Sequence, residues 1–201
     1  MPKKSFKIAF FELEPWEKEY FLKNLKKCQI KFIDDHLNVN NVNEVKDIDA
    51  IGIFIYSIID KKILEMMPNL KLISNLSTGF DHVNLEECRK RKIIVCNVPH
   101  YGENTVAEHT FALMLALARK IHKAYEKTVR GDFTLDGLRG TDLQGKTIGV
   151  IGTGNIGQHV IRIAKGFDMK IIAFDKLKNK KLAKILGFRY VSLDFLLKNS
   201  D

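Results

Sequence analysis

The sequence predicts an α/β protein whose sheets are built from parallel strands. Short apolar runs alternate strictly with amphipathic segments along the chain, which is the pattern of consecutive strand–helix–strand units. The run at residues 50–56 is apolar without alternation, as expected of a strand whose two faces are both covered. The chain has 201 residues, of which 45% are hydrophobic, so it is long enough for one large or two small domains with real cores.

The first hundred residues are expected to form one doubly wound unit. A first strand is predicted at residues 6–11, and Pro15 suits the first position of the next helix, where its missing N–H costs nothing. This helix is expected to bury a stripe made of Trp16, Tyr20, Phe21 and Leu25. Further strands are expected at residues 30–33, 50–56, 70–76 and 93–98, a loop at 36–43, and helices at 60–67 and 85–91.

A long helix is expected next. Thr105 and Glu108 have the spacing of a capping box, in which Thr105 is the N-cap. Apolar residues between Val106 and Ile121 cover most of the helix circumference, which predicts a helix buried between layers. The polar segment 134–144 contains glycines and is expected to be a loop.

The second half is organised around a glycine-rich turn. The apolar run 146–151 leads into Gly152-x-Gly154-x-x-Gly157, where an amphipathic helix pattern opens. Gly152 permits the tight turn, Gly154 lets a pyrophosphate approach the backbone, and Gly157 lets the helix pack against the sheet. The helix N-terminus offers free N–H groups and the positive end of its dipole to phosphates.

A second strand is expected at residues 169–174, and it ends at Asp175, about 20 residues beyond the glycines. A carboxylate there accepts hydrogen bonds from both ribose hydroxyls and repels a 2′-phosphate, which favours NAD over NADP. The alternative is a glycine-rich turn without a ligand. The remaining expected elements are a helix at 180–186, a short strand at 189–191 and a helical turn or two at 193–198.

A second phosphate-binding pattern, Gly140-x-x-x-x-Gly145-Lys146-Thr147, is rejected. The phosphate loop of nucleotide triphosphatases follows a strand and opens a helix. Here the pattern follows a loop and precedes a strand. Lys146 and Thr147 are therefore expected to begin that strand.

Composition narrows the possible partners. The formal net charge is +9, but the lysines are scattered and not interleaved with aromatic residues, so nucleic-acid binding is not expected. The longest uncharged apolar run, 110–118, is too short to span a bilayer. The cysteines form no C-x-x-C pair, which fits free thiols in a reducing cytoplasm; they are Cys28, Cys88 and Cys96. No metal site is predicted.

Three stretches together resemble the D-isomer-specific 2-hydroxyacid dehydrogenases. They are residues 74–84, 97–110 and 143–157. The likeness runs through essentially the whole chain in the family's order. Within the family, the context of Tyr101 and the strand end at Asp175 favour the D-lactate dehydrogenases.

The resemblance implies a flavodoxin-like substrate domain over residues 1–103, followed by the first half of a Rossmann NAD-binding domain over residues 104–201. The implied reaction is hydride transfer between NAD(H) and a 2-hydroxy or 2-oxo acid, with D-lactate and pyruvate favoured. The family's catalytic arginine, acid and histidine normally follow the position of Asp201. No catalytic residue is therefore assigned, and this chain alone is expected to be an inactive fragment.

The resemblance also implies site residues. Backbone N–H groups near Ser77, Thr78 and Gly79 would meet the substrate carboxylate, since consecutive amides bind an anion without a charged side chain. Tyr101 would lie near the substrate, although a packed interdomain tyrosine is an alternative. The residues expected to bind NAD are Gly152, Gly154, Asn155, Ile156, Gly157 and Asp175, with Thr105 and Val106 near the nicotinamide.

The sequence leaves three hypotheses about the function of the whole protein open. The first is a cytoplasmic dehydrogenase that forms a homodimer through the long helix, as relatives imply. The second is a non-enzymatic NAD-binding protein that resembles the family's transcriptional co-repressors. The third is an incomplete gene product without independent function, whose exposed sheet edge would favour aggregation.

Overall fold

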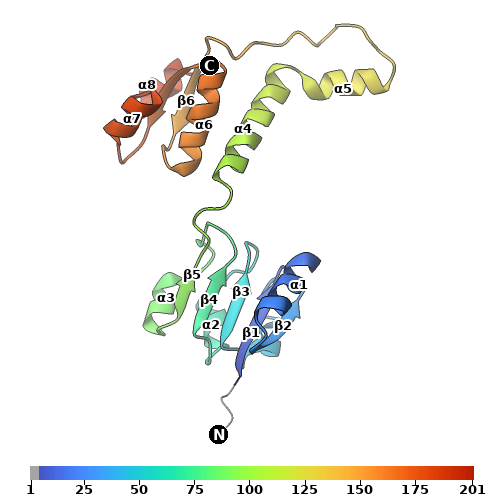
Figure 1. Cartoon of the computed structure of the whole chain (residues 1–201), viewed down its shortest axis with the longest axis vertical. Coiled ribbons are helices and arrows are strands. Elements are labelled where there is room, and N and C mark those ends of the chain that lie inside the picture. The colour runs from blue at the N-terminus through green and yellow to red at the C-terminus, as the bar shows by residue number, and fades with distance from the viewer. Residues whose placement is uncertain (1–4) are drawn as a thin grey trace. The chain divides into compact units, whose positions relative to one another are not determined.

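The computed structural model describes residues 5–201, and the chain divides into two compact units. The first ends at Tyr101 and the second runs from Gly102 to Asp201. Figure 1 shows the elements of both units. Every strand pair in the described part of the chain is parallel, so the predicted α/β class with parallel sheets is confirmed.

The first unit has a five-stranded sheet in the order β2-β1-β3-β4-β5, which is the flavodoxin-like order. Its predicted fold is therefore confirmed. In chain order the elements are β1 (Phe6–Phe11), α1 (Pro15–Asn24), β2 (Cys28–Ile33), the 3₁₀ helix η1 (Val42–Val45), β3 (Ala50–Ile53), α2 (Lys61–Glu65), β4 (Leu72–Asn75), α3 (Leu85–Lys90) and β5 (Ile94–Cys96).

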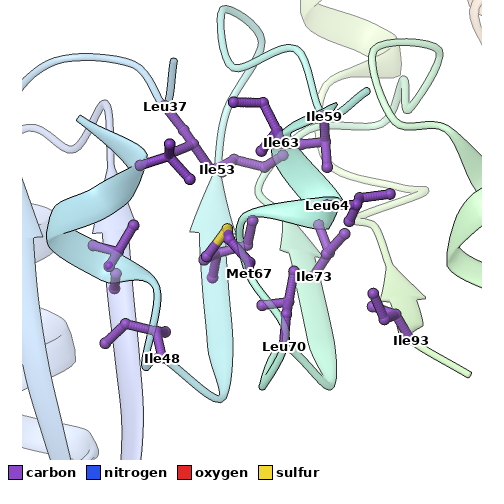
Figure 2. Packing of buried hydrophobic residues seen from close by; sticks show 14 of the residues in the cluster. Leu37, Ile48, Ile53, Ile59, Ile63, Leu64, Met67, Leu70, Ile73 and Ile93 are labelled. Atoms are coloured by element: carbon purple, nitrogen blue, oxygen red, sulfur yellow. The ribbon is translucent and has the colours of Figure 1, made fainter. Parts of the chain in front are cut away.

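The pleat of β1 divides the first unit into two layers of packing. Ala9 and Phe11 are fully buried in the main core, together with residues of η1, α2 and α3. Figure 2 shows part of this core, with Ile53 and Ile73 of the sheet near Met67, which follows α2. On the other face the ring of Phe10 stacks on Phe21 of α1, with 4.1 Å between ring centroids.

The predicted buried stripe of α1 is wrong for Trp16 and Tyr20, whereas Phe21 and Leu25 are half-buried. Trp16 and Tyr20 are 68% and 61% exposed, and no residue of α1 is buried. Helical spacing shows only that these side chains share a face. Of the predicted stripe, Phe21 does meet the sheet, because its ring stacks on the ring of Phe10.

The second unit has a three-stranded sheet in the order β6-β7-β8, with α4 and α6 packed against each other. The rings of Phe111 and Phe167 stack in its core at 5.4 Å. The elements are α4 (Glu103–Ala118), α5 (Ile121–Val129), β6 (Thr147–Ile151), α6 (Asn155–Gly166), β7 (Lys170–Phe174), α7 (Lys180–Leu186), β8 (Arg189–Tyr190) and α8 (Leu193–Asn199).

The start and burial of the long helix differ from the prediction. Gly102 is the N-cap of α4, so Thr105 lies inside the first turn and does not cap it. Only Ala107 and Phe111 of α4 are buried, while Leu117 is 65% exposed. An apolar circumference therefore does not show that neighbouring layers cover the whole helix.

The helix also ends earlier than its apolar pattern does. The backbone N–H of Thr141 donates to the carbonyl oxygen of Ala118 at 2.9 Å, so the loop before β6 contributes to the end of α4. Lys120 then takes a left-handed conformation with φ of 55°, and α5 begins at Ile121. A distant loop residue thus helps to end α4 three residues before the predicted end at Ile121, and α5 lies almost entirely beyond the predicted helix.

The rejected phosphate-loop pattern leads directly into β6, and no helix follows it, which confirms its rejection. Within residues 5–201, none of the helices combines the length and apolar character needed to cross a membrane.

Candidate functional site

The glycine-rich turn joins β6 to α6 in the way its spacing predicts. Gly152 has φ of +92°, a conformation that side chains rarely adopt, and its N–H donates to Phe174 O at 2.8 Å. A Cβ at Gly157 would lie much closer to the backbone oxygen of Gly152 than 3.0 Å, the distance below which real Cβ contacts essentially never occur. A Cβ at Gly154 would meet nothing within 4 Å, so open space lies over this N-cap.

The first turn of α6 supplies anion-binding groups beside this open space. Asn155 and Ile156 begin the helix, and the first N–H groups of a helix have no partner within it. The helix dipole adds a positive potential at the same end. The geometry therefore suits the binding of a phosphate group.

The start of α4 lies beside the start of α6. The side-chain amide of Asn155 donates to Glu103 Oε1 at 3.5 Å. Thr105 and Val106 lie in the first turn of α4 with exposed side chains. The cofactor residues expected on the two helices therefore gather at one end of the second unit.

Asp175 follows β7 and turns its carboxylate toward the glycine-rich turn. Its Oδ2 accepts hydrogen bonds from the backbone N–H of Thr153 at 2.7 Å and from Thr153 Oγ1 at 2.9 Å. Its Oδ1 accepts from Leu177 N at 2.9 Å. These bonds, that from Thr153 N foremost, lower the pKa of Asp175 below its usual value, so the carboxylate is held in its charged form.

Two residues of the hydrogen-bond network around Asp175, namely Thr153 and Tyr190, were not predicted from the sequence. Thr153 is 6% exposed, and its hydroxyl lies 2.8 Å from the hydroxyl of Tyr190 on β8. Thr153 occupies a variable position of the glycine pattern, where only the glycines carried a prediction. Tyr190 reaches the turn because β8 pairs with β7, with Tyr190 opposite Ala173. Only that register indicates its role.

The loop after β4 in the first unit is held by two hydroxyls and an amide. Ser77 Oγ donates to Gly79 O at 2.8 Å, and Thr78 Oγ1 donates to Val98 O at 3.0 Å. Asn97, another residue that the sequence reasoning missed, donates from Nδ2 to Thr78 O at 2.8 Å. These bonds fix the backbone of the loop at the carboxyl end of the sheet, where ligands bind in open α/β sheets.

The N–H groups of this loop are available. Within the described part of the chain, the backbone N–H groups of Ser77, Thr78 and Gly79 donate to no protein acceptor. Consecutive amides of this kind form an anion-binding site. The arrangement suits the carboxylate of a small acid.

Further polar groups lie near the same loop. The side-chain amide of Asn75, which is fully buried, and Nε2 of His82 have no hydrogen-bond partner within residues 5–201. Buried polar groups are normally paired with protein or with an ordered molecule. Tyr101 is the last residue of the first unit, with a 60% exposed ring.

Comparison with known families gives two matches that together span almost the whole chain. The model described as D-isomer specific 2-hydroxyacid dehydrogenase, catalytic domain, matches residues 8–154. The model described as D-isomer specific 2-hydroxyacid dehydrogenase, NAD binding domain, matches residues 111–201. The second match agrees with NAD as the expected cofactor.

Individual relatives belong to the same group of dehydrogenases and reductases. A 2-hydroxyacid dehydrogenase homolog of Haemophilus influenzae is 39% identical over 96% of this chain and 60% of its own length. A glyoxylate reductase of Pyrococcus furiosus is 34% identical over 95% of this chain and 55% of its own length. The chain thus spans less than two thirds of the length of these relatives.

One solved structure has a closely similar backbone. It is the D-lactate dehydrogenase of Aquifex aeolicus in complex with NAD and lactic acid, with a TM-score of 0.90 and 35% identity. The similarity covers 96% of this chain and 58% of that one.

Proposed function

The chain belongs to the D-isomer-specific 2-hydroxyacid dehydrogenases, and we propose that it supplies the substrate loop and the NAD-binding residues for hydride exchange with a small 2-hydroxy or 2-oxo acid. The observation that carries this proposal is the Asp175 carboxylate. It is charged, fixed by Thr153, and placed beside the glycine-rich turn at the carboxyl ends of β6 and β7.

The cofactor roles follow from this geometry. The pyrophosphate binds at the N-terminus of α6, over Gly152, Gly154 and Gly157, with Asn155 and Ile156 in the first turn. Asp175 accepts a hydrogen bond from the adenosine ribose. Thr105 and Val106 at the start of α4 lie near the nicotinamide. The domain of residues 104–201 is thus proposed as the NAD-binding part.

The substrate role falls to the domain of residues 1–103. The amides of Ser77, Thr78 and Gly79 bind the carboxylate of the acid, and Tyr101 lies near its remaining atoms. The free N–H groups of the loop support this assignment. The family relationship also supports a homodimer for the active enzyme and a cytoplasmic location.

Lactate and pyruvate are the favoured substrate pair, because the similar Aquifex aeolicus enzyme was solved with lactic acid. Glyoxylate is the second candidate, because a relative of comparable identity is a glyoxylate reductase. Comparing kcat/KM for NADH-dependent reduction of pyruvate and of glyoxylate, measured on the enzyme of which this chain is proposed to be a part, decides between them. A higher value for glyoxylate would reverse the assignment.

The cofactor assignment is tested by calorimetric titration of the purified protein with NAD. Asp175→Ala is expected to weaken binding about tenfold or more, because a hydrogen bond to a charged group is lost. Asp194→Ala, on the exposed first turn of α8, is the matched control and should bind as the wild type does. Equal affinities of the Asp175→Ala variant and the wild type would refute the role of Asp175.

A further inference from the structure

The hydroxyl of Thr153 stands between a tyrosine and the carboxylate of Asp175. Its Oγ1 donates to Asp175 Oδ2 at 2.9 Å and lies 2.8 Å from the hydroxyl of Tyr190. The backbone N–H of Asn179 donates to the same tyrosine hydroxyl at 3.2 Å. Four residues from three separate segments therefore form one continuous chain of hydrogen bonds.

The direction of each bond in this chain follows from proton counting. A carboxylate is an acceptor only, so the single proton of the Thr153 hydroxyl is used on Asp175. Thr153 Oγ1 must then accept from Tyr190, whose own oxygen accepts from Asn179 N. Every bond therefore points toward the carboxylate, an arrangement in which each hydrogen bond polarises the next.

The chain also determines which oxygen of Asp175 faces a ligand. Thr153 already supplies two donors to Oδ2, through its N–H and its hydroxyl. A carboxylate oxygen offers two acceptor positions, so Oδ2 is filled. Oδ1 accepts from Leu177 N and is the oxygen left for a ribose hydroxyl.

We propose that Tyr190 and Thr153 are positioning residues that fix the Asp175 carboxylate for the adenosine ribose and thereby set the preference for NAD over NADP. This inference rests on the proposed NAD site. A carboxylate held by two donors on Oδ2 cannot turn away from a 2′-phosphate, so the repulsion is retained in full. A carboxylate that has lost these donors can rotate, and the repulsion weakens.

The ring of Tyr190 is placed independently of its hydroxyl. It packs edge-on against Phe188, with ring centroids 5.1 Å apart and an interplanar angle of 77°. Tyr190→Phe therefore keeps the ring contact and removes only the hydroxyl. Thr153→Val keeps the shape of the side chain and the backbone bond to Asp175, and Thr153→Ser restores a hydroxyl.

The test measures Kd for NAD and for NADP by calorimetry on the full chain, and reports the ratio of the two. Thr153→Val is expected to lower the ratio of the Kd for NADP to the Kd for NAD about tenfold, because it removes a hydrogen bond to a charged group. Tyr190→Phe is expected to lower this ratio about threefold, because it removes a hydrogen bond between neutral groups. Thr153→Ser should restore the ratio. Tyr125→Phe, on the exposed face of α5, is the control and should leave it unchanged.

The ratio separates positioning from general damage. A purely structural role would weaken NAD and NADP alike and leave their ratio at the wild-type value, which would overturn the inference. A wild-type ratio in Thr153→Val with unchanged NAD affinity would overturn it as well. Failure of the wild-type protein to bind NAD would instead overturn the proposed function, and this inference with it.

Discussion

Replacing Gly157 by alanine is expected to destabilise the second unit and to weaken NAD binding. A Cβ at this position would lie about 1 Å inside the 3.0 Å limit of real Cβ contacts. The atom it meets is the backbone oxygen of Gly152, so no flexible side chain can move aside. Either α6 withdraws from the sheet or the turn opens.

The expected cost follows from two opposing effects. Overpacking costs about 1–3 kcal/mol, and the rigid backbone neighbour favours the upper end of this range. Alanine in place of glycine inside a helix returns about 1 kcal/mol. The free energy of unfolding should therefore fall by about 2 kcal/mol.

The assay is urea-induced unfolding followed by circular dichroism, together with an NAD titration. Gly166→Ala is the matched control, because it lies in the same helix and a Cβ there meets nothing within 4 Å. This control should be neutral or slightly stabilising. An unfolding midpoint of Gly157→Ala at or above that of the wild type would refute the packing argument.

Three further predictions concern other parts of the chain. Gly52→Ala should destabilise the first unit by about 1–3 kcal/mol in urea unfolding, because a Cβ at this position would overlap the ring of Phe10. If the double variant with Phe10→Leu recovers none of the lost stability, the overlap is not the cause. Lys120→Gly should stabilise the second unit by up to about 1 kcal/mol, because Lys120 has φ of 55°, a conformation that favours glycine. The control Lys123→Gly, within α5, should destabilise the unit by about 1 kcal/mol. A higher melting temperature for Lys123→Gly than for Lys120→Gly would contradict this prediction. The pKa of Asp132 is lowered from 3.8 to about 2, first by the hydrogen bond from the backbone N–H of Thr134. The stabilising contribution of this carboxylate is therefore complete above pH 3.8 and is lost as the pH falls through about 2. A titration midpoint of Asp132 of about 4, measured by NMR, would show that the hydrogen bonds to this carboxylate do not form.

Much of the fold could be predicted because its causes are local. Gly152 takes φ of +92°, and a requirement of this kind is visible in the sequence as a glycine. The predicted helix at 180–186 likewise depends on neighbouring residues, because it begins where the side chain of Asn179 accepts from Leu182 N. The parallel direction of the strands in the first sheet follows from the alternation of strands and helices.

The errors share a different origin. Trp16 and Tyr20 were expected to be buried because they lie at helical spacing, but spacing does not reveal whether a neighbouring surface covers them. The early end of the long helix involves Thr141 N, which bonds to Ala118 O from a separate segment. Neither contact surface is encoded within the helix concerned.

The candidate site shows the same division. The sequence by itself determined the glycine-rich turn, the helix that opens from it and the acid at the end of the next strand, because each depends on residues close together in the chain. Only the tertiary structure decided that Thr153 and Tyr190 hold Asp175. The bonds from Thr153 need β6 paired with β7, and the contact of Tyr190 needs β8 paired with β7. Hydrogen bonds between distant segments are set by strand register, and no local pattern carries that information.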